Sequence, residues 1–207
     1  MPFLLNILSF ILMLTSCSSS GNEAKTANPV VNTSKIETRP VVAPQADKLI
    51  SKKTFGKITV GMQVTSLQEL YPDMNTEERP VYEYGVDGET MGILLKNQAK
   101  PYLYLWTMQG DSKIHGITAL SPDLQTTDGL KVGSTVTEIL SLYPNSEAGI
   151  SFIDDTEFIY IEELGLRFEF LTTPESRIGD YEFNNDPQPQ FRKFKVESAK
   201  VDRISIP

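Results

Sequence analysis

A pattern of apolar and polar positions occurs twice along the chain, at 58–73 and again at 130–145. Both copies begin near Val-Gly and end near Leu-Tyr-Pro, and seven of the sixteen positions are identical. The two anchoring glycines, Gly61 and Gly133, lie 72 positions apart. Agreement of this kind indicates a duplicated structural unit. Each glycine stands where a strand is expected to turn into a helix, a place that favours positive φ or a close backbone approach.

Each copy predicts a short amphipathic helix. In the second copy Thr135 and Glu138 have the spacing of a capping box, and Pro144 ends the helix. In the first copy Gln63 stands where the capping threonine would be, so a weaker helix start is expected before Pro72. The apolar positions follow one helical face in each copy: Val136, Ile139, Leu140 and Tyr143, and Val64, Leu67 and Tyr71. Helices this short do not persist alone, so both must pack against a sheet.

Runs with strand character follow each helix. They lie at 79–86, 89–95, 101–108 and 112–120 after the first helix, and at 148–153, 157–163, 165–172 and 199–207 after the second. Asp87-Gly88 predicts a tight hairpin between the first two runs. The closing runs share Lys-[Ile/Val]-x-x-Ile at a larger offset than the helices, which places a net insertion within 174–196 of the second unit.

The predicted fold class is therefore α+β. Two tandem units, each a short helix followed by about four antiparallel strands, form one extended sheet with the helices on one face. The predicted organisation is a signal peptide over 1–16, a flexible tether over 17–48, repeat unit 1 over 49–123, and repeat unit 2 over 124–207 with the insertion near 174–196.

The strand at 101–108 predicts a binding surface. Alternation places Tyr102, Tyr104 and Trp106 on one side and the intervening leucines on the other. If the helices cover the leucine side, the three aromatic side chains lie on the open face, where they suit contact with a partner protein. The alternative is a central strand that is buried on both faces.

The equivalent run in the second unit, 165–172, supports a solvated face. Leu166, Phe168 and Phe170 form its apolar side, which leaves Arg167 and Glu169 on the outer side.

The apolar run at 3–17 has the length of a secretory signal segment and ends in Leu14-Thr15-Ser16-Cys17. This ending resembles the lipobox of bacterial lipoproteins. The resemblance implies that the preceding peptide is removed and that Cys17 carries the acyl groups, which makes it the lipidation site. The alternative for this single cysteine is a buried free thiol.

Charge and composition exclude several classes of function. A formal net charge of −8 opposes binding to nucleic acid and to anionic lipid, so membrane contact is expected through the lipid anchor alone. His115 is the only histidine, so neither a usual zinc site nor a Cys/His pair is expected. The acidic pairs Asp154-Asp155 and Glu162-Glu163 leave catalysis open in principle, but a turn is the plainer explanation of the first. A loose Ca²⁺ site at Asp154-Asp155 or at Asp180 and Asp186 is a further alternative, although we predict no catalytic residue, metal or cofactor.

The Val-Gly pair, the short helix and the closing strand are similar to a module of two protein groups. These are the β-lactamase-inhibitor-protein-like fold and the SmpA/OmlA-type assembly lipoproteins of the outer membrane. The resemblance implies a protein-binding role. We therefore predict a non-enzymatic lipoprotein, lipid-anchored in the bacterial cell envelope at the outer membrane facing the periplasm, that binds another envelope protein through its sheet. The alternative is a lipoprotein with a cleft between the repeats that binds or hydrolyses a glycan or lipid.

The lipobox generates a direct test. Replacement of Cys17 by serine should leave an uncleaved precursor or move the protein into the soluble fraction, because the acylated sulfur is lost. Membrane fractionation and the apparent mass of the product measure this. A mature-sized variant that still partitions into detergent would contradict the lipoprotein interpretation.

Overall fold

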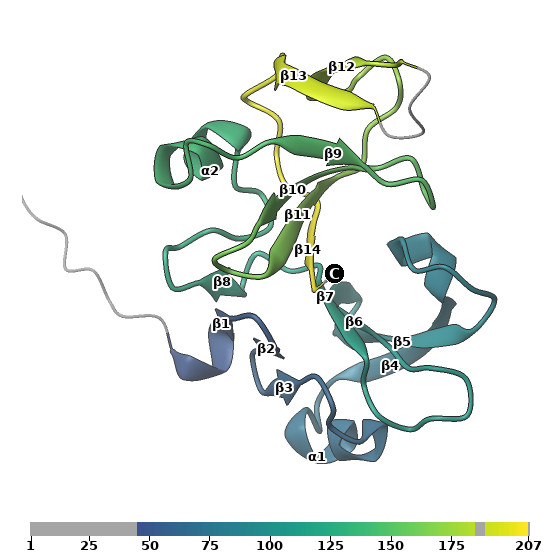
Figure 1. Ribbon diagram of the computed structural model, residues 1–207. Helices are drawn as coiled ribbons and strands as arrows, with labels where there is room; N and C mark the ends of the chain where they lie inside the picture. Colours follow the sequence, from purple (N-terminus) through teal and green to yellow (C-terminus); the bar gives the residue numbers. More distant parts are fainter. Residues whose placement is uncertain (1–44, 185–188, 207) are drawn as a thin grey trace, which may run out of the picture. The chain divides into compact units, whose positions relative to one another are not determined.

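Strands make up most of the regular secondary structure in the computed structural model, which describes residues 45–184 and 189–206 (Figure 1). The strands are β1 Leu49–Ile50, β2 Thr54–Phe55, β3 Ile58–Thr59, β4 Asn75–Pro80, β5 Met91–Asn97, β6 Lys100–Trp106, β7 Gly116–Ala119, β8 Gln125–Thr126, β9 Ala148–Ile150, β10 Glu157–Ile161, β11 Leu166–Phe170, β12 Gly179–Glu182, β13 Gln190–Phe194 and β14 Arg203–Ser205. The α-helices are α1 Leu67–Leu70 and α2 Val136–Leu142, and the 3₁₀ turns are η1 Ala46–Lys48, η2 Val64–Ser66 and η3 Val81–Tyr84. Within this part of the chain, no helix has the length and apolarity needed to cross a membrane.

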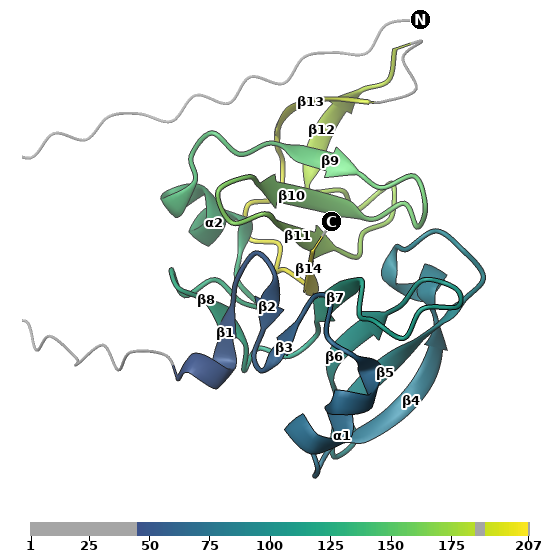
Figure 2. The ribbon, with the colours of Figure 1, turned by 60° about the horizontal axis from the view of Figure 1, so that its bottom comes forward.

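The largest sheet has eight strands in the order β4-β5-β6-β7-β14-β11-β10-β9. All of its neighbouring strands are antiparallel. It consists of two runs, β4 to β7 and β9 to β11 with β14, that meet where β7 pairs with β14 (Figures 1 and 2). This junction has only two residue pairs, Ile204 with Ala119 and Ser205 with Thr118.

A second, four-stranded sheet has the order β3-β2-β1-β8, and its β1 runs parallel to β8. Each of these strands is two residues long, so the ladder alone gives little stability. Their apolar side chains are instead buried with those of the eight-stranded sheet and of α2 in the main core, for example Ile50, Phe55 and Ile58. Packing on the large sheet is therefore what holds the small one.

The predicted fold class is wrong. The chain is mostly β, and its strands form separate sheets of eight, four and two strands rather than one extended sheet made of two helix-and-strand units. In the part of the chain that the structure describes, α1 is a single turn, and only α2, with seven residues, is longer. The four-stranded sheet was missed because two-residue strands are too short to show the alternation on which a strand prediction depends.

The predicted difference between the two helix starts is confirmed: the second has a capping box and the first has none. In α2 the Thr135 hydroxyl accepts a hydrogen bond from the Glu138 N–H at 3.2 Å, and Glu138 Oε2 accepts one from the Thr135 N–H at 2.7 Å. In the first copy Gln63 makes no side-chain cap, and the segment begins as a 3₁₀ turn before its one α-helical turn. The missing capping pair explains why the first helix is shorter.

The repeated glycines make equivalent backbone contacts. The Gly61 N–H donates to the Ile114 carbonyl at 2.7 Å, and the Gly133 N–H donates to the Val201 carbonyl at 2.8 Å. Both acceptors lie in the repeated Lys-[Ile/Val]-x-x-Ile motif. The φ angles are +92° and +91°, so the expected positive φ is confirmed, whereas no atom lies within 4 Å of an added Cβ and close approach plays no part. The division into units at residue 123 stays a prediction.

The first predicted strand and its hairpin are wrong. β4 ends at Pro80, and the following Val81–Tyr84 forms η3 instead of continuing the strand over 79–86. Gly85, at φ +73°, ends this turn, so the connection to β5 is a wide loop and not a tight hairpin at Asp87-Gly88. The apolar side chain of Val81 is buried against the sheet face opposite the main core, and this burial outweighs its strand propensity.

The insertion near 174–196 forms a separate two-stranded sheet, β12 with β13. A buried carboxylate, that of Glu157, fastens it to the large sheet. This carboxylate accepts hydrogen bonds from the N–H groups of Ile178 at 2.7 Å and Gly179 at 2.9 Å, and from the hydroxyls of Tyr181 and Thr172. Four donors satisfy a charge that would otherwise be costly to bury.

Replacement of Gly133 by valine should destabilise the fold by about 1–3 kcal/mol, because a β-branched residue is strained at this positive φ. Asparagine at the same position should cost less, because it tolerates left-handed backbone better. Denaturant unfolding measures both. The matched control is Lys131→Val, two residues away on an exposed side chain, for which a change within about 0.5 kcal/mol is expected. Equal costs for Gly133→Val and Lys131→Val would show that φ does not limit this position.

Candidate functional site

Two of the three aromatic residues proposed as a partner-binding patch are buried. Tyr102 is 6% exposed and Tyr104 is 0% exposed, so their expected place on an open face is wrong. Only Trp106 remains half-exposed. The alternative of a strand covered on both faces describes β6 at these two positions. The binding role itself is not tested by this burial.

A β-bulge explains the position of Tyr102. Leu95 pairs with Leu103 and Lys96 pairs with Pro101, which leaves Tyr102 as an extra residue on its strand. A bulge interrupts the two-residue alternation, so Tyr102 turns into the main core beside Leu103. There its ring meets that of Tyr71 edge-on, with 5.9 Å between the centroids.

Tyr104 stays on the other face, where η3 covers it. Its ring stacks on that of Tyr84 with 3.7 Å between the centroids, and its hydroxyl donates to the Arg79 carbonyl at 3.1 Å. Burial raises the pKa of Tyr104 above its ordinary value, so the hydroxyl keeps its proton and acts as the donor in this bond.

A buried ion cluster lies on this same face. The Arg203 guanidinium donates to the carboxylates of Glu169 and Asp154 and, at 3.0 Å, to the backbone carbonyl of Glu83. Ser205 donates to the second oxygen of Glu169. The expectation that Glu169 points into solvent is therefore wrong, because η3 and the loop before β10 cover it. Burial alone would lower the pKa of Arg203, but the two carboxylates outweigh it and raise the pKa.

The acidic pair Asp154-Asp155 has a structural role. Asp155 adopts positive φ in the turn, and its carboxylate accepts from Arg177 at 2.7 Å. The Asp154 carboxylate binds Arg203 and the Thr156 hydroxyl. No group of three or more His, Cys, Asp or Glu side chains suited to a metal occurs in residues 45–184 and 189–206. Asp186 and Cys17, the predicted lipidation site, lie outside the described residues.

His115 is half-buried beside Trp106, with 6.0 Å between the ring centroids. Its Nε2 lies 2.7 Å from Asp111 Oδ2, a pairing within one loop. This hydrogen bond within one loop is sufficient to explain the half-buried position of His115.

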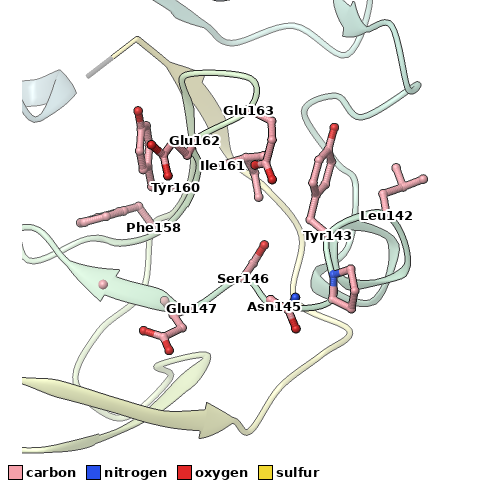
Figure 3. Close-up of a pocket in the computed structure, with 13 residues that line it drawn as sticks. Leu142, Tyr143, Asn145, Ser146, Glu147, Phe158, Tyr160, Ile161, Glu162 and Glu163 are labelled. Atoms are coloured by element: carbon pink, nitrogen blue, oxygen red, sulfur yellow. The ribbon is translucent and has the colours of Figure 1, made fainter.

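A hollow of about 550 Å³ lies between the end of α2 and β10 (Figure 3). Tyr143, on the helix side, faces Glu163 across it, and Tyr160 and Phe158 extend from β10. Tyr143 donates to Asp128 at 2.6 Å, and burial together with this bond raises the pKa of Tyr143 to about 12. The hollow is acidic, because its charged lining residues are Glu147, Glu162 and Glu163. Among the described residues none of these three carboxylates forms an ion pair.

Exposed apolar side chains continue from this hollow over β10 and the loop that joins it to β9. Phe152 is 64% exposed, Ile153 50% and Tyr160 42%. With Phe158 they form what we call the β9 patch. A second hollow of about 270 Å³ lies among them, and Arg167 borders it with its guanidinium 4.5 Å from the centroid of the Phe158 ring. The sequence signal for this patch was an apolar pair, Phe152-Ile153, directly before the Asp154-Asp155 turn.

The comparisons with known proteins give a fold likeness only. No family model matches the chain, and no curated protein matches it. Among solved structures, the crystal structure of the uncharacterized protein yfeY from Escherichia coli is similar to 76% of this chain and 97% of its own, at 13% identity and a TM-score of 0.48. A likeness at this level carries no argument about function.

The Arg203 cluster predicts a pH dependence. Burial favours a raised pKa for Asp154, but hydrogen bonds from Thr156, Ser151 and Arg203 outweigh it and lower the pKa. A lowered folded-state pKa gives stability that is present above the unfolded value, about 3.9, and is lost as the pH falls through the folded value. Replacement of Asp154 by asparagine should therefore cost about 1–3 kcal/mol at pH 7, and the difference from wild type should shrink below pH ~4.

Urea unfolding between pH 7 and pH 3 measures this difference. The control is Asp155→Asn. Because the Asp155 carboxylate is more exposed, this replacement should lower the free energy of unfolding by less than about 1 kcal/mol. A difference for Asp154→Asn that stays constant across this range would contradict the assignment.

Proposed function

We propose that the chain is a non-catalytic lipoprotein of the bacterial cell envelope that binds another envelope protein through the outer face of its eight-stranded sheet. Anchoring through acylated Cys17, at the outer membrane facing the periplasm, is part of the proposal and rests on the lipobox. The sheet contact belongs to the β9 patch and not to the buried tyrosines of β6.

The observation that carries the proposal is the exposure of the β9 patch. Large apolar side chains gathered on one surface are costly in water, and such a group typically marks an interaction site. Aromatic side chains beside an arginine, as in Phe158 with Arg167, are the residue types that contribute most to protein–protein affinity. The carboxylates of Glu147, Glu162 and Glu163 supply a polar rim.

The edge of the sheet supports the same proposal. β9 pairs with residues 157–159 of β10 and not with its last two, Tyr160 and Ile161. An unpaired backbone edge next to apolar side chains suits an incoming extended segment, which supplies the missing hydrogen bonds.

A second candidate function is the binding of a glycan, the alternative given in the sequence analysis. The hollow in Figure 3 combines the rings of Tyr143 and Tyr160 with unpaired carboxylates, and sugars bind to such surfaces through ring stacking and hydroxyl hydrogen bonds.

Site-specific photo-crosslinking in producing cells tests the first candidate. A benzophenone side chain at position 152 or 160 should give an adduct with the same protein, whereas position 82, a similarly exposed tyrosine outside the patch, should not. With the purified partner, Phe152→Ala should weaken binding about tenfold or more. Adducts from position 82 alone would contradict the patch. If positions 152 and 160 give no protein adduct and instead form adducts with envelope glycan fragments, the second candidate is favoured.

A further inference from the structure

A trough crosses the middle of the outer sheet face because its central strands carry small side chains there. Register places Tyr104, Thr118, Ser205, Arg167 and Tyr160 in one row across five strands. Directly paired residues lie on the same face of a sheet. The small side chains of Thr118 and Ser205 therefore lie between the large side chains of Tyr104 and Arg167. The result is a hollow of about 140 Å³ between Trp106 and Arg167.

Trp106 closes one side of this hollow. It pairs with Gly116, and its indole lies so close over that glycine that a Cβ there would collide with Nε1. Val86 and Tyr84, from the loop around η3, line the same side. The polar side-chain groups of this wall are the indole N–H and the Tyr84 hydroxyl.

Besides the Tyr84 hydroxyl, three hydrogen-bond donors line the hollow without a protein acceptor. They are the Trp106 indole N–H, the Thr118 hydroxyl and the Arg167 guanidinium, and none of them donates to another residue in the part of the chain that the structure describes. Indole and guanidinium are donors only, so they cannot satisfy one another. None of the three is sealed from solvent, so an acceptor from outside the chain can reach them.

The one carboxylate that lines the hollow does not fill this role. Glu169 is already bound through one oxygen to Arg203 and through the other to Ser205. Arg167 contacts the Phe158 ring and forms no ion pair with a described residue, so its charge remains available for an anion.

We propose that this hollow is a binding site for a carboxylate with a small apolar stem. The guanidinium presents two parallel N–H groups to the two carboxylate oxygens, the geometry in which this pair binds most strongly. The Thr118 hydroxyl and the indole N–H complete the acceptors' hydrogen bonds, and the stem packs against Trp106 and Val86. The volume holds a carboxylate with two or three carbons, which is either a free short-chain acid or the last residue of a polypeptide. The site does not depend on the proposed binding of a protein through the β9 patch.

The single tryptophan makes the site directly observable. In a ¹⁵N-edited NMR spectrum of the protein, Trp106 gives the only indole N–H signal. We expect propionate, and the peptide Gly-Gly-Ala with a free C-terminus, to move this signal downfield in a saturable way. The same peptide with an amidated C-terminus, and sodium chloride at equal ionic strength, should not move it. Tighter binding of the peptide acid than of propionate identifies a chain terminus as the ligand, and the reverse order identifies a free acid.

Two substitutions test the donors. Arg167→Gln should weaken propionate binding by about tenfold or more, and Thr118→Val, which keeps the side-chain shape, should weaken it several-fold. Arg192→Gln is the matched control, because it removes the same charge from a guanidinium of β13 that is paired with Glu182, and it should leave binding unchanged. The proposal is overturned by an indole signal that does not respond, by equal binding of the amidated peptide, by tighter binding of inorganic phosphate than of propionate, or by an unchanged affinity in Arg167→Gln. Failure of these titrations leaves crosslinking at positions 152 and 160 unaffected, so the two proposals fail separately.

Discussion

The arrangement of the outer sheet face depends on one buried cation. Arg203 stands on β14, at the junction of the two strand runs, and its guanidinium reaches a strand neighbour, Glu169, a loop residue, Asp154, and the Glu83 carbonyl of η3. Removing such a charge from water is costly, and only a full set of partners offsets the cost. Because those partners come from separate segments, satisfying Arg203 fixes where η3 and the loop before β10 lie. The trough is bordered by Tyr84 and Val86 from the segment around η3, and Phe152 and Ile153 of the β9 patch stand on the loop before β10 itself.

The sequence was informative where a local rule decides the structure. The capping pair Thr135 and Glu138, and the positive φ of Gly61 and Gly133, follow from residue type and position alone. Apart from β4, the strands of the large sheet were located, because their alternation extends over several residues. The separate small sheet could not be found, since its strands are too short to carry a pattern.

Errors arose where tertiary contacts override alternation. At Tyr102 a single extra residue turns the side chain to the other face, and nothing in the local sequence marks the bulge. Alternation placed Glu169 on the outer side of its strand, but it is buried there, because its partner Arg203 lies far away in the sequence. The hollow between Trp106 and Arg167 was not predicted for the same reason. Thr118, Ser205 and Arg167 become neighbours only through the register of β7, β14 and β11, which no short segment encodes.

The attachment of the β12–β13 hairpin has a consequence for cooperativity. The hairpin lies outside the large sheet, and a segment of that kind often opens separately while the rest of a fold stays intact. Here its first residues provide three of the four donors that satisfy the fully buried Glu157 carboxylate. Detaching the hairpin would leave that charge inside the protein with the Thr172 hydroxyl alone. Partial opening is therefore penalised, and we expect the insertion to unfold together with the sheet as one cooperative unit.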